Sequence, residues 1–358
     1  QQRVGGRRLP DVTVVDLKKK KSKDGKLFGE TLARAVEQTF SEGNQSILLL
    51  NRRGFSASVV CRDCGIMVEC KHCKVTLNLH KGRRRLVCHY CGYNMPENVL
   101  CGCCGSTNLI PVGFGTERVE EEVSQLLPDA AVARIDSDIA SDRKKFLALL
   151  KAMKEREIDI LVGTQMIAKG LHFPFVTLVG VVWADGGLAF PDYRAGEKTY
   201  QLLAQVTGRA GRGDSAGRVI IQTMQPEHYA IQFASGHKYR ELAEKEIAIR
   251  RSAGFPPFER LVSIRVESDS EESAREKAQT IAAEARKWCL NTSNSATISV
   301  LGPAPAPIEK IRDMYRWQVM LKGRKITTLH EIVEYLEKSN RKKGREKIIV
   351  DVDPENML

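Results

Sequence analysis

The segment SILLLNRRG (residues 46–54) indicates the type of fold, because an uninterrupted apolar run gives way abruptly to polar and basic residues. Such a run is typical of a strand buried on both faces of a parallel sheet. Further strands are predicted at residues 130–135, 158–162, 176–182 and 219–223. The helical periods between them lie at residues 28–40, 116–127, 141–154 and 193–207. Strands that alternate with helices indicate an α/β domain with helices on both faces of a parallel sheet.

Composition narrows the class of protein. The chain has 358 residues and a formal net charge of +12, with 42% apolar and 28% charged residues. This length suggests two or three domains, and the composition excludes wholesale disorder. No stretch approaches the roughly 18 consecutive apolar residues that cross a bilayer, so no membrane association is expected. The positive charge favours an acidic partner, with nucleic acid first. Residues 1–5 hold neither Met nor a signal pattern, and are expected to follow a cut in a longer chain.

Cysteine is concentrated in one segment. Nine of the ten cysteines lie between residues 61 and 104, and eight of these form four CxxC pairs: Cys61/Cys64, Cys70/Cys73, Cys88/Cys91 and Cys101/Cys104. Eight thiolates suffice for two tetrahedral four-cysteine zinc sites. A disulfide framework would need a secretion signal, and redox CxxC motifs come singly beside a βαβ unit. We therefore expect two structural zinc ions, whose closed thiolate shells leave no position open for catalysis.

Loop lengths predict which pairs share a metal. Only five residues separate Cys64 from Cys70, a very short loop for two facing knuckles. Fourteen residues separate Cys73 from Cys88, close to the common zinc-ribbon spacing. A nested arrangement is predicted, with an inner group (Cys70, Cys73, Cys88, Cys91) and an outer group (Cys61, Cys64, Cys101, Cys104).

Several residues of this segment leave alternatives open. Cys103 could replace a neighbouring ligand, and the competing histidines are His72, His80 and His89. The basic run of Arg83, Arg84 and Arg85 is either a solvated hairpin tip or a contact with nucleic-acid phosphates. Gly65, Gly92 and Gly105 follow second cysteines and are expected to form the knuckle turns.

Another unit, of the α+β class, is predicted near the carboxyl end of the chain. It follows a break at residues 225–237, a charged helix at 239–251 and a rigid turn at 254–258. Its elements are a strand at 261–266, a helix at 270–290, strands at 297–301 and 316–321, a helix at 327–338 and a strand at 347–352. This βαββαβ order indicates a ferredoxin-like domain. The segment GPAPAP (residues 302–307) is expected to be an extended connector.

The predicted organisation is thus one unit inserted into another. The α/β domain comprises residues 1–56 and 110–232, and the zinc insertion comprises residues 57–109. Residues 233–358 form the carboxy-terminal domain, which is expected to bind DNA or protein partners.

Three segments at or near strand ends carry features of a phosphate site, since ligands of α/β sheets bind there. In GTQMIAKG (residues 163–170) a Gly and a Thr can present a backbone amide and a hydroxyl to phosphates. WADGG (residues 183–187) also follows a strand. QVTGRAGRG (residues 205–213) places two Arg on one helix face, and guanidinium groups suit the charge of phosphoryl transfer. Each segment alone fits ordinary turn chemistry, but the three in one series favour a nucleotide-dependent function.

QVTGRAGR resembles helicase motif VI, and GTQMIAKG resembles motif V of superfamily 2 helicases. Together with LLLNRRGF (residues 48–55), the four CxxC pairs and DYRAGEKTYQLLAQVTGRAGR (residues 192–212), they make the chain similar to the primosomal protein N′ family of replication-restart helicases. The similarity runs from about residue 9 to residue 354. It implies a monomeric, ATP-dependent 3′→5′ DNA helicase in the bacterial cytoplasm, associated with the nucleoid. Its implied partners are forked and single-stranded DNA, primosome proteins and single-stranded-DNA-binding proteins.

The resemblance also implies residue roles. Arg209 and Arg212 would meet the ATP phosphates across a cleft, with Gln205 close to the same site. The other nucleotide-site residues would be Gly163, Thr164, Gln165, Gly170 and Gly208. The residues expected to contact DNA are Asn51, Arg52, Arg53, Arg83, Arg84, Arg85, Lys169 and Trp317, although core packing is the alternative for Trp317.

Two parts of a complete helicase are missing from the sequence, namely a GxxxxGK[ST] phosphate loop and an Asp-Glu-x-His magnesium motif. In the family both lie in the first RecA-like lobe. The chain is therefore expected to contain RecA-like lobe 2, the zinc insertion and the terminal domain, with ATP and Mg²⁺ bound only in the complete enzyme. An alternative function is a DNA- and partner-binding zinc module without ATPase activity. A zinc-ribbon transcription or translation factor would leave GRAGRG and GTQMIAKG unexplained.

Overall fold

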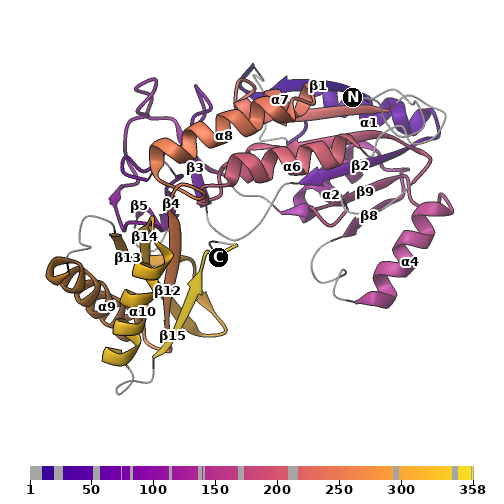
Figure 1. Cartoon of the computed structure of the whole chain (residues 1–358). Coiled ribbons are helices and arrows are strands. Elements are labelled where there is room, and N and C mark those ends of the chain that lie inside the picture. Colours follow the sequence, from indigo (N-terminus) through magenta and orange to yellow (C-terminus); the bar gives the residue numbers. More distant parts are fainter. Residues whose placement is uncertain are drawn as a thin grey trace.

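The computed structural model describes residues 10–19, 27–50, 57–73, 75–80, 84–112, 115–135, 139, 142–167, 173–208, 217–292, 298–340, 346–355 and 357. These residues form a parallel α/β lobe, a small cysteine-rich sheet and an antiparallel α+β domain (Figure 1). Within these ranges, no helix is long and apolar enough to cross a membrane.

The lobe is built on a sheet of six parallel strands in the order β1-β11-β10-β2-β9-β8. Their bounds are β1 Asp11–Asp16, β2 Gln45–Leu50, β8 Val132–Ile135, β9 Ile160–Gly163, β10 Val176–Trp183 and β11 Arg218–Thr223. The predicted α/β fold and its five strands are confirmed. The edge strand β1 was not predicted, because its half-exposed sequence DVTVVD becomes a strand by pairing with the distant β11.

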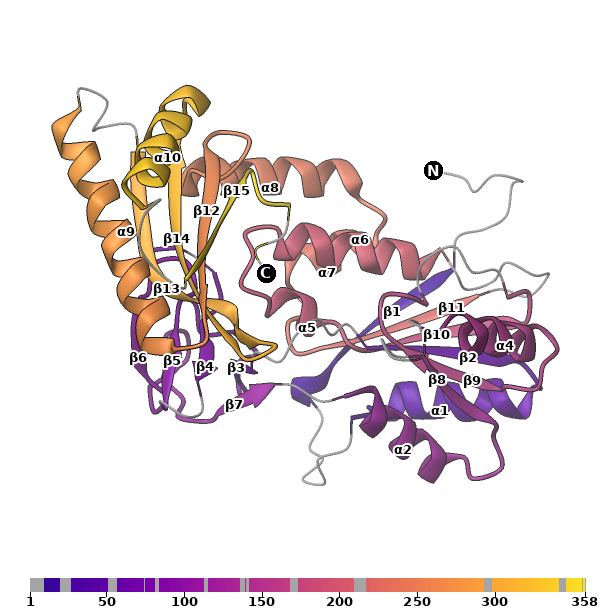
Figure 2. The same cartoon turned by 90° about the horizontal axis from the view of Figure 1, so that it is seen from below.

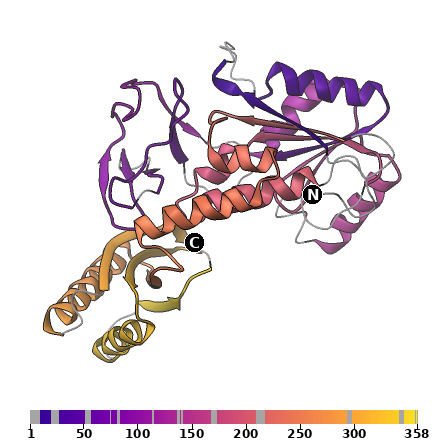
Figure 3. The same ribbon diagram turned by 45° about the horizontal axis from the view of Figure 1, so that its top comes forward.

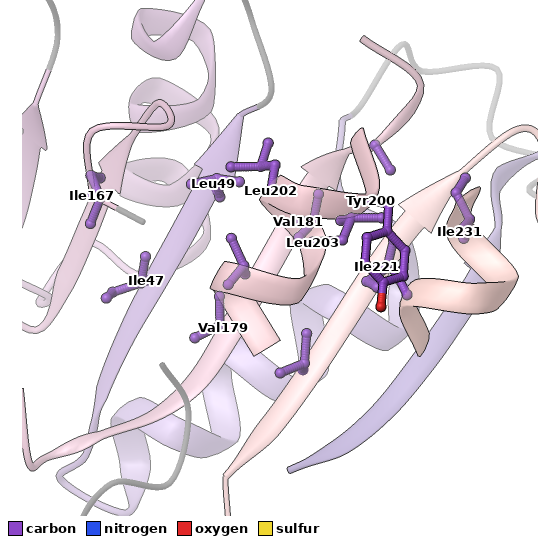
Figure 4. Packing of buried hydrophobic residues seen from close by; sticks show 14 of the residues in the cluster. Ile47, Leu49, Ile167, Val179, Val181, Tyr200, Leu202, Leu203, Ile221 and Ile231 are labelled. Carbon is purple, nitrogen blue, oxygen red and sulfur yellow. The ribbon is translucent and has the colours of Figure 1, made fainter. Parts of the chain in front are cut away.

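Helices cover both faces of this sheet (Figure 2). They are α1 Glu30–Ser41, α2 Thr116–Leu126, α4 Arg143–Lys154, α5 Asp185–Leu188, α6 Ala195–Thr207 and α7 Tyr229–Ser235. Alternate residues of β2 enter different cores, since Leu48 packs with α1 and α2 while Leu49 packs with α6. Figure 4 shows Leu202 of α6 lying over Leu49. Burial on both faces explains the continuous apolar runs of the central strands.

The cysteine-rich sheet is inserted between β2 and α2, as predicted, and has five short strands in the order β6-β5-β4-β3-β7. Their bounds are β3 Ala57–Cys61, β4 Asn78–His80, β5 Arg85–Val87, β6 Asn94–Pro96 and β7 Leu109–Val112. The last strand extends three residues beyond the predicted end of the insertion at residue 109.

The carboxy-terminal domain contains β12 Arg260–Ser268, α9 Glu271–Asn291, β13 Ile298–Ile311, β14 Met314–Gly323, α10 Ile326–Asn340 and β15 Lys347–Val352. The four strands pair antiparallel in the order β13-β14-β12-β15. Numbered within the domain, this order is 2-3-1-4, the arrangement of the ferredoxin-like fold. Both helices pack on one face of the sheet through a shared apolar cluster, so the predicted βαββαβ architecture is confirmed.

The expected connector at residues 302–307 is wrong as an element assignment, because these residues belong to β13. β13 is an edge strand of its sheet, where Pro is tolerated since one row of N–H groups needs no partner. Its pairing with β14 shifts register between Leu301 and Ala304, at the Gly302-Pro303 step. An alternating Pro-Ala sequence is extended in either case, and only the neighbouring strand distinguishes a connector from an edge strand.

Helix α8 (Tyr239–Ala253) runs from the lobe to the carboxy-terminal domain (Figure 3). Its first turns pack in the lobe core through Leu242, and it ends at Gly254 in the left-handed conformation with φ 63°. Helix α7 also belongs to the lobe core, through Ala230 and Ile231. The predicted domain boundary after residue 232 therefore falls inside α7.

The cysteine-rich sheet lies between the two larger units. On one side Val60 and Met67 pack in the lobe core. On the other side Leu86 and Tyr90 share a cluster with Leu261 and Met320 of the carboxy-terminal sheet. The insertion therefore connects the lobe to the terminal domain by direct packing.

Candidate metal centres and nucleotide-facing motifs

The eight paired cysteines gather into the two predicted nested groups. Within each group all four Sγ atoms lie within 4.8 Å of one another. Three pairs have Sγ–Sγ distances of 3.6 Å (Cys61–Cys104), 3.5 Å (Cys64–Cys101) and 3.7 Å (Cys70–Cys91). A tetrahedron with zinc–sulfur bonds of about 2.3 Å has edges of about 3.8 Å. The geometry therefore fits two structural zinc ions, each held by four thiolates.

Three of the four knuckles have a glycine directly after the second cysteine; in the fourth, Lys74 follows Cys73. The amide N–H groups of Gly65, Gly92 and Gly105 donate to the carbonyl oxygens of Cys61, Cys88 and Cys101 at 2.8, 3.0 and 2.9 Å. All three glycines have φ between 72° and 79°, a conformation that L side chains rarely adopt. Their predicted role as turn residues is confirmed.

The two cysteine groups differ in how far their side chains are buried. In the inner group Cys70 and Cys88 are fully buried, whereas the outer group includes the exposed Cys104. Hydrogen bonds from the thiols of Cys73, Cys88 and Cys91 lower the pKa of Cys70, which favours the thiolate that binds a metal.

The competing ligands lie outside both groups as far as the structure describes them. Cys103 is exposed and belongs to neither cluster. His72 packs edge-on against Tyr93, and His80 pairs through Nδ1 with Glu309. His89 is buried, and its Nδ1 lies 2.8 Å from the carbonyl oxygen of Pro305. Burial lowers the pKa of His89 to about 4, so it is neutral at pH 7.

The motif V segment begins where predicted, at the carboxyl end of β9. Gly163 is the last residue of the strand, and a Cβ there would lie 2.8 Å from the carbonyl oxygen of Ile135. Thr164 and Gln165 follow in a turn and are half-buried at the carboxyl end of β9. The Thr164 carbonyl accepts a hydrogen bond from the amide of Ile167. Residues Lys169 and Gly170 lie outside the described residues.

The WADGG segment has a structural role. The Asp185 carboxylate is fully buried and accepts hydrogen bonds from the Thr223 hydroxyl at 2.8 Å and the Met224 amide at 3.0 Å. Burial raises the pKa of Asp185. These bonds join the carboxyl ends of β10 and β11, so this carboxylate is already engaged within the fold.

The motif VI segment occupies the carboxyl end of α6. Gln205 is exposed there, while Val206 and Thr207 are buried against the lobe and Gly208 ends the helix. Exposure leaves the Gln205 side chain outside the lobe core. Arg209 and Arg212 lie outside the described residues.

The residues predicted to contact DNA fall into two sets. The first set lies outside the described residues and comprises Asn51, Arg52, Arg53, Arg83 and Lys169. Among the others, Arg84 pairs with Glu97 at 2.6 Å, and Arg85 donates to the side-chain oxygen of Asn94 at 2.6 Å. Both are exposed beside the tip of the β4–β5 hairpin. Trp317 is half-buried and packs on the core of the carboxy-terminal domain.

One junction between the units was not predicted from the sequence. The turn Asp192–Arg194, just before α6, contacts the cysteine-rich sheet, α8 and the end of the chain. The sequence signal was a run of aromatic and charged residues at the start of a helix. This run does not indicate which residues the turn contacts.

Comparisons with known families match all three units. Residues 107–214 match the Helicase conserved C-terminal domain, residues 70–96 match the PriA DNA helicase Cys-rich region domain, and residues 251–355 match the Primosomal protein N C-terminal domain. The three families follow the observed architecture, with the Cys-rich match inside the insertion.

Curated relatives match along nearly the whole chain. Replication restart protein PriA of Bacillus subtilis is 40% identical, covering 100% of this chain and 44% of the relative. The proteins of the same name from Haemophilus influenzae and Synechocystis are 36% and 39% identical, covering 96% and 90% of this chain. The chain spans 46% and 39% of those two relatives, so it is about half their length or less. These matches identify the chain as corresponding to a carboxy-terminal portion of the replication restart protein PriA family.

Proposed function

We propose that the chain is the carboxy-terminal part of an ATP-dependent 3′→5′ DNA helicase that acts at stalled or abandoned replication forks and restarts replication by primosome assembly. One observation carries this proposal. A two-zinc module of the PriA Cys-rich type is inserted between β2 and α2 of a lobe that matches the helicase C-terminal domain. The chain as a DNA-binding zinc module without ATPase activity would leave the helicase motifs of that lobe without a role.

In the proposed mechanism this lobe supplies half of an ATP site. ATP and Mg²⁺ bind in the complete enzyme against a first RecA-like lobe. Arg209 and Arg212 then reach the phosphates from this side, where planar guanidinium groups stabilise the charge of phosphoryl transfer. Gln205 stands at the end of α6, in the helix that leads into these arginines.

The strand ends provide a route from nucleotide to DNA. β2 and β9 are neighbours in the sheet and run parallel, so their carboxyl ends, at Leu50 and Gly163, lie at the same edge of the sheet. Asn51, Arg52 and Arg53 follow the first strand, and motif V follows the second. A change in motif V with nucleotide state therefore acts beside the proposed DNA contacts.

The proposed DNA substrate is forked, with a single-stranded arm, and the net charge of +12 supports phosphate contacts. The proposed protein partners are primosome components and single-stranded-DNA-binding proteins. The family resemblance supports a monomer in the bacterial cytoplasm, associated with the nucleoid.

The proposal is tested by ATP hydrolysis in the complete protein, with and without forked DNA. Arg209→Ala and Arg212→Ala should each abolish DNA-stimulated hydrolysis and leave DNA affinity nearly unchanged, whereas Arg240→Ala, at an exposed position of α8, should retain both. The 358-residue chain by itself should hydrolyse no ATP. Normal hydrolysis in both arginine variants, or robust turnover by the isolated chain, would contradict the proposal.

A further inference from the structure

Three parts of the molecule converge on the turn Asp192–Arg194. The Tyr193 ring stacks on Phe255, which follows α8, with ring centroids 4.9 Å apart and an interplanar angle of 10°. The backbone N–H of Tyr193 donates to the hydroxyl of Tyr90 at 3.3 Å, and Tyr90 is fully buried between Cys88 and Cys91 of the inner zinc group. The zinc module and the end of α8 therefore both hold this turn.

The carboxy-terminal domain reaches the same turn through Arg194. The Arg194 guanidinium donates to the backbone carbonyl of Pro354 at 3.1 Å and also to that of Glu355. These residues follow β15 and are fixed to the domain, since Asp353 accepts from Arg260 of β12 and its amide donates to the Leu261 carbonyl at 2.8 Å. One side chain thus joins the lobe to the end of the terminal domain.

The turn is rigid at its connection to α6. The Asp192 side chain is fully buried and accepts from the amide of Arg194 at 2.9 Å and from the Lys198 ammonium at 2.5 Å. One turn further along, a Cβ at Gly196 would lie 2.2 Å from the Tyr229 hydroxyl oxygen, so α7 abuts the helix start closely. A displacement of the turn therefore moves the first turn of α6 with it.

α6 leads from this turn to the motif VI segment. Its 13 residues span about 20 Å, and Gln205 lies near its far end. Leu202, Leu203 and Val206 pack on the lobe core, so the far half of α6 is held by one continuous apolar contact. The sequence then continues directly into Arg209 and Arg212.

We propose that Arg194 is a positioning residue that transmits the position of the zinc module and the carboxy-terminal domain through α6 to the motif VI arginines. The inference rests on the proposed function, because those arginines matter only if the complete protein hydrolyses ATP. DNA bound by the zinc module and the carboxy-terminal domain sets the position of the turn Asp192–Arg194. This turn then sets the position of α6 on the lobe. Arg194 touches neither ATP nor DNA in this scheme.

The first test uses the 358-residue chain with its zinc bound and measures backbone hydrogen exchange. Arg194→Ala should accelerate exchange at residues 204–208, the far end of α6, by about five-fold or more. Arg194→Lys keeps one donor and should give an intermediate change. Arg34→Ala, an exposed residue of α1, should change nothing in α6. Acceleration confined to residues 195–199 would overturn the inference, since a purely local role predicts that result.

The second test uses the complete protein. Arg194→Ala should reduce the stimulation of ATP hydrolysis by forked DNA about five-fold or more, while hydrolysis without DNA and zinc content stay unchanged. Tyr90→Phe, which removes only the hydroxyl that holds Tyr193, should act in the same direction. Full stimulation in both variants would overturn the inference. If the unsubstituted complete protein shows no DNA-stimulated hydrolysis, the proposed function fails, and the exchange result still decides whether Arg194 positions α6.

Discussion

The side-chain amide of Gln318 on β14 donates a hydrogen bond of 2.6 Å to the backbone carbonyl of His89, inside the second knuckle of the inner zinc group. His89 in turn lies 2.8 Å from the carbonyl oxygen of Pro305 on β13 through its Nδ1, which donates in this pairing. Both groups are buried, so each bond would be costly to leave unmade. Folding of the inner zinc group and docking of the carboxy-terminal domain are therefore coupled.

Removing an inner ligand should release one metal ion and loosen the terminal domain. Cys70→Ser should leave one zinc per chain instead of two and lower the thermal unfolding temperature, because Cys70 shares its apolar cluster with Phe255 and Met320. Metal analysis and protease cleavage near residues 254–258 measure both effects. Cys103→Ser serves as the control and should keep two zinc ions; loss of zinc in that variant would show that the ligand assignment of the outer group is wrong.

Two knuckle glycines should respond differently to the same substitution. A Cβ at Gly92 would lie 2.7 Å from the carbonyl oxygen of Pro303, whereas a Cβ at Gly105 would meet nothing within 4 Å. Both residues have positive φ, so Gly105→Ala should cost only about 1–2 kcal/mol of backbone strain. Gly92→Ala adds a clash with the docked domain and should destabilise the chain more in urea unfolding. Equal losses would argue against close docking of the inner knuckle on β13.

Stability should fall on acidification because of His228. Burial lowers its pKa to about 4 from the ordinary 6.5, and its neutral Nδ1 accepts from the amide of Ala230 at the start of α7. The folded state therefore disfavours the protonated ring, so the stabilising contribution is complete above pH 6.5 and is lost as pH falls towards 4. The upper limit of the loss is about 3 kcal/mol.

His228→Asn keeps a side-chain acceptor at the helix start and removes the titration. The unfolding free energy of the unsubstituted chain minus that of the His228→Asn variant should decrease as the pH falls from 6.5 to 4. His89 titrates equally in both chains. A difference that stays constant over this range would exclude a contribution from His228.

Binding of forked DNA should weaken steeply as salt concentration rises, because lysine and arginine side chains that bind phosphates release counterions from the DNA. Replacing Arg84 and Arg85 together by Ala should reduce the slope of log affinity against log salt by about one for each of these arginines that binds a phosphate. Arg275→Ala, which breaks an intrahelical pair with Glu272 on α9, is a matched control. An affinity that ignores salt would argue against phosphate binding by these side chains.

Local sequence was enough to predict the features whose causes are local. Cysteine spacing predicted the two metal groups, because the five residues between Cys64 and Cys70 are too few for two knuckles to face each other across one metal. Apolar runs such as residues 176–182 required a sheet covered on both faces, and the structure has one.

The features that could not be predicted depend on partners far away in the chain. β1 is a strand because β11 lies beside it, and residues 302–307 join a sheet because β14 does. The WADGG segment was grouped with the strand-end features of a phosphate site, but the Asp185 carboxylate accepts hydrogen bonds from Thr223 and Met224. The turn around Tyr193 is likewise defined by side chains from three other segments.

The pairing of β3 with β7 has a consequence for how the insertion is joined to the lobe. In chain order these are the first and last strands of the cysteine-rich sheet. Ser58 lies opposite Val112 in their antiparallel ladder. The first and last strands of the insertion therefore lie side by side, so the inserted sheet is closed by its own two ends. A short connection in place of residues 59–111 would bridge these two ends, but the lobe core would then lose Val60 and Met67.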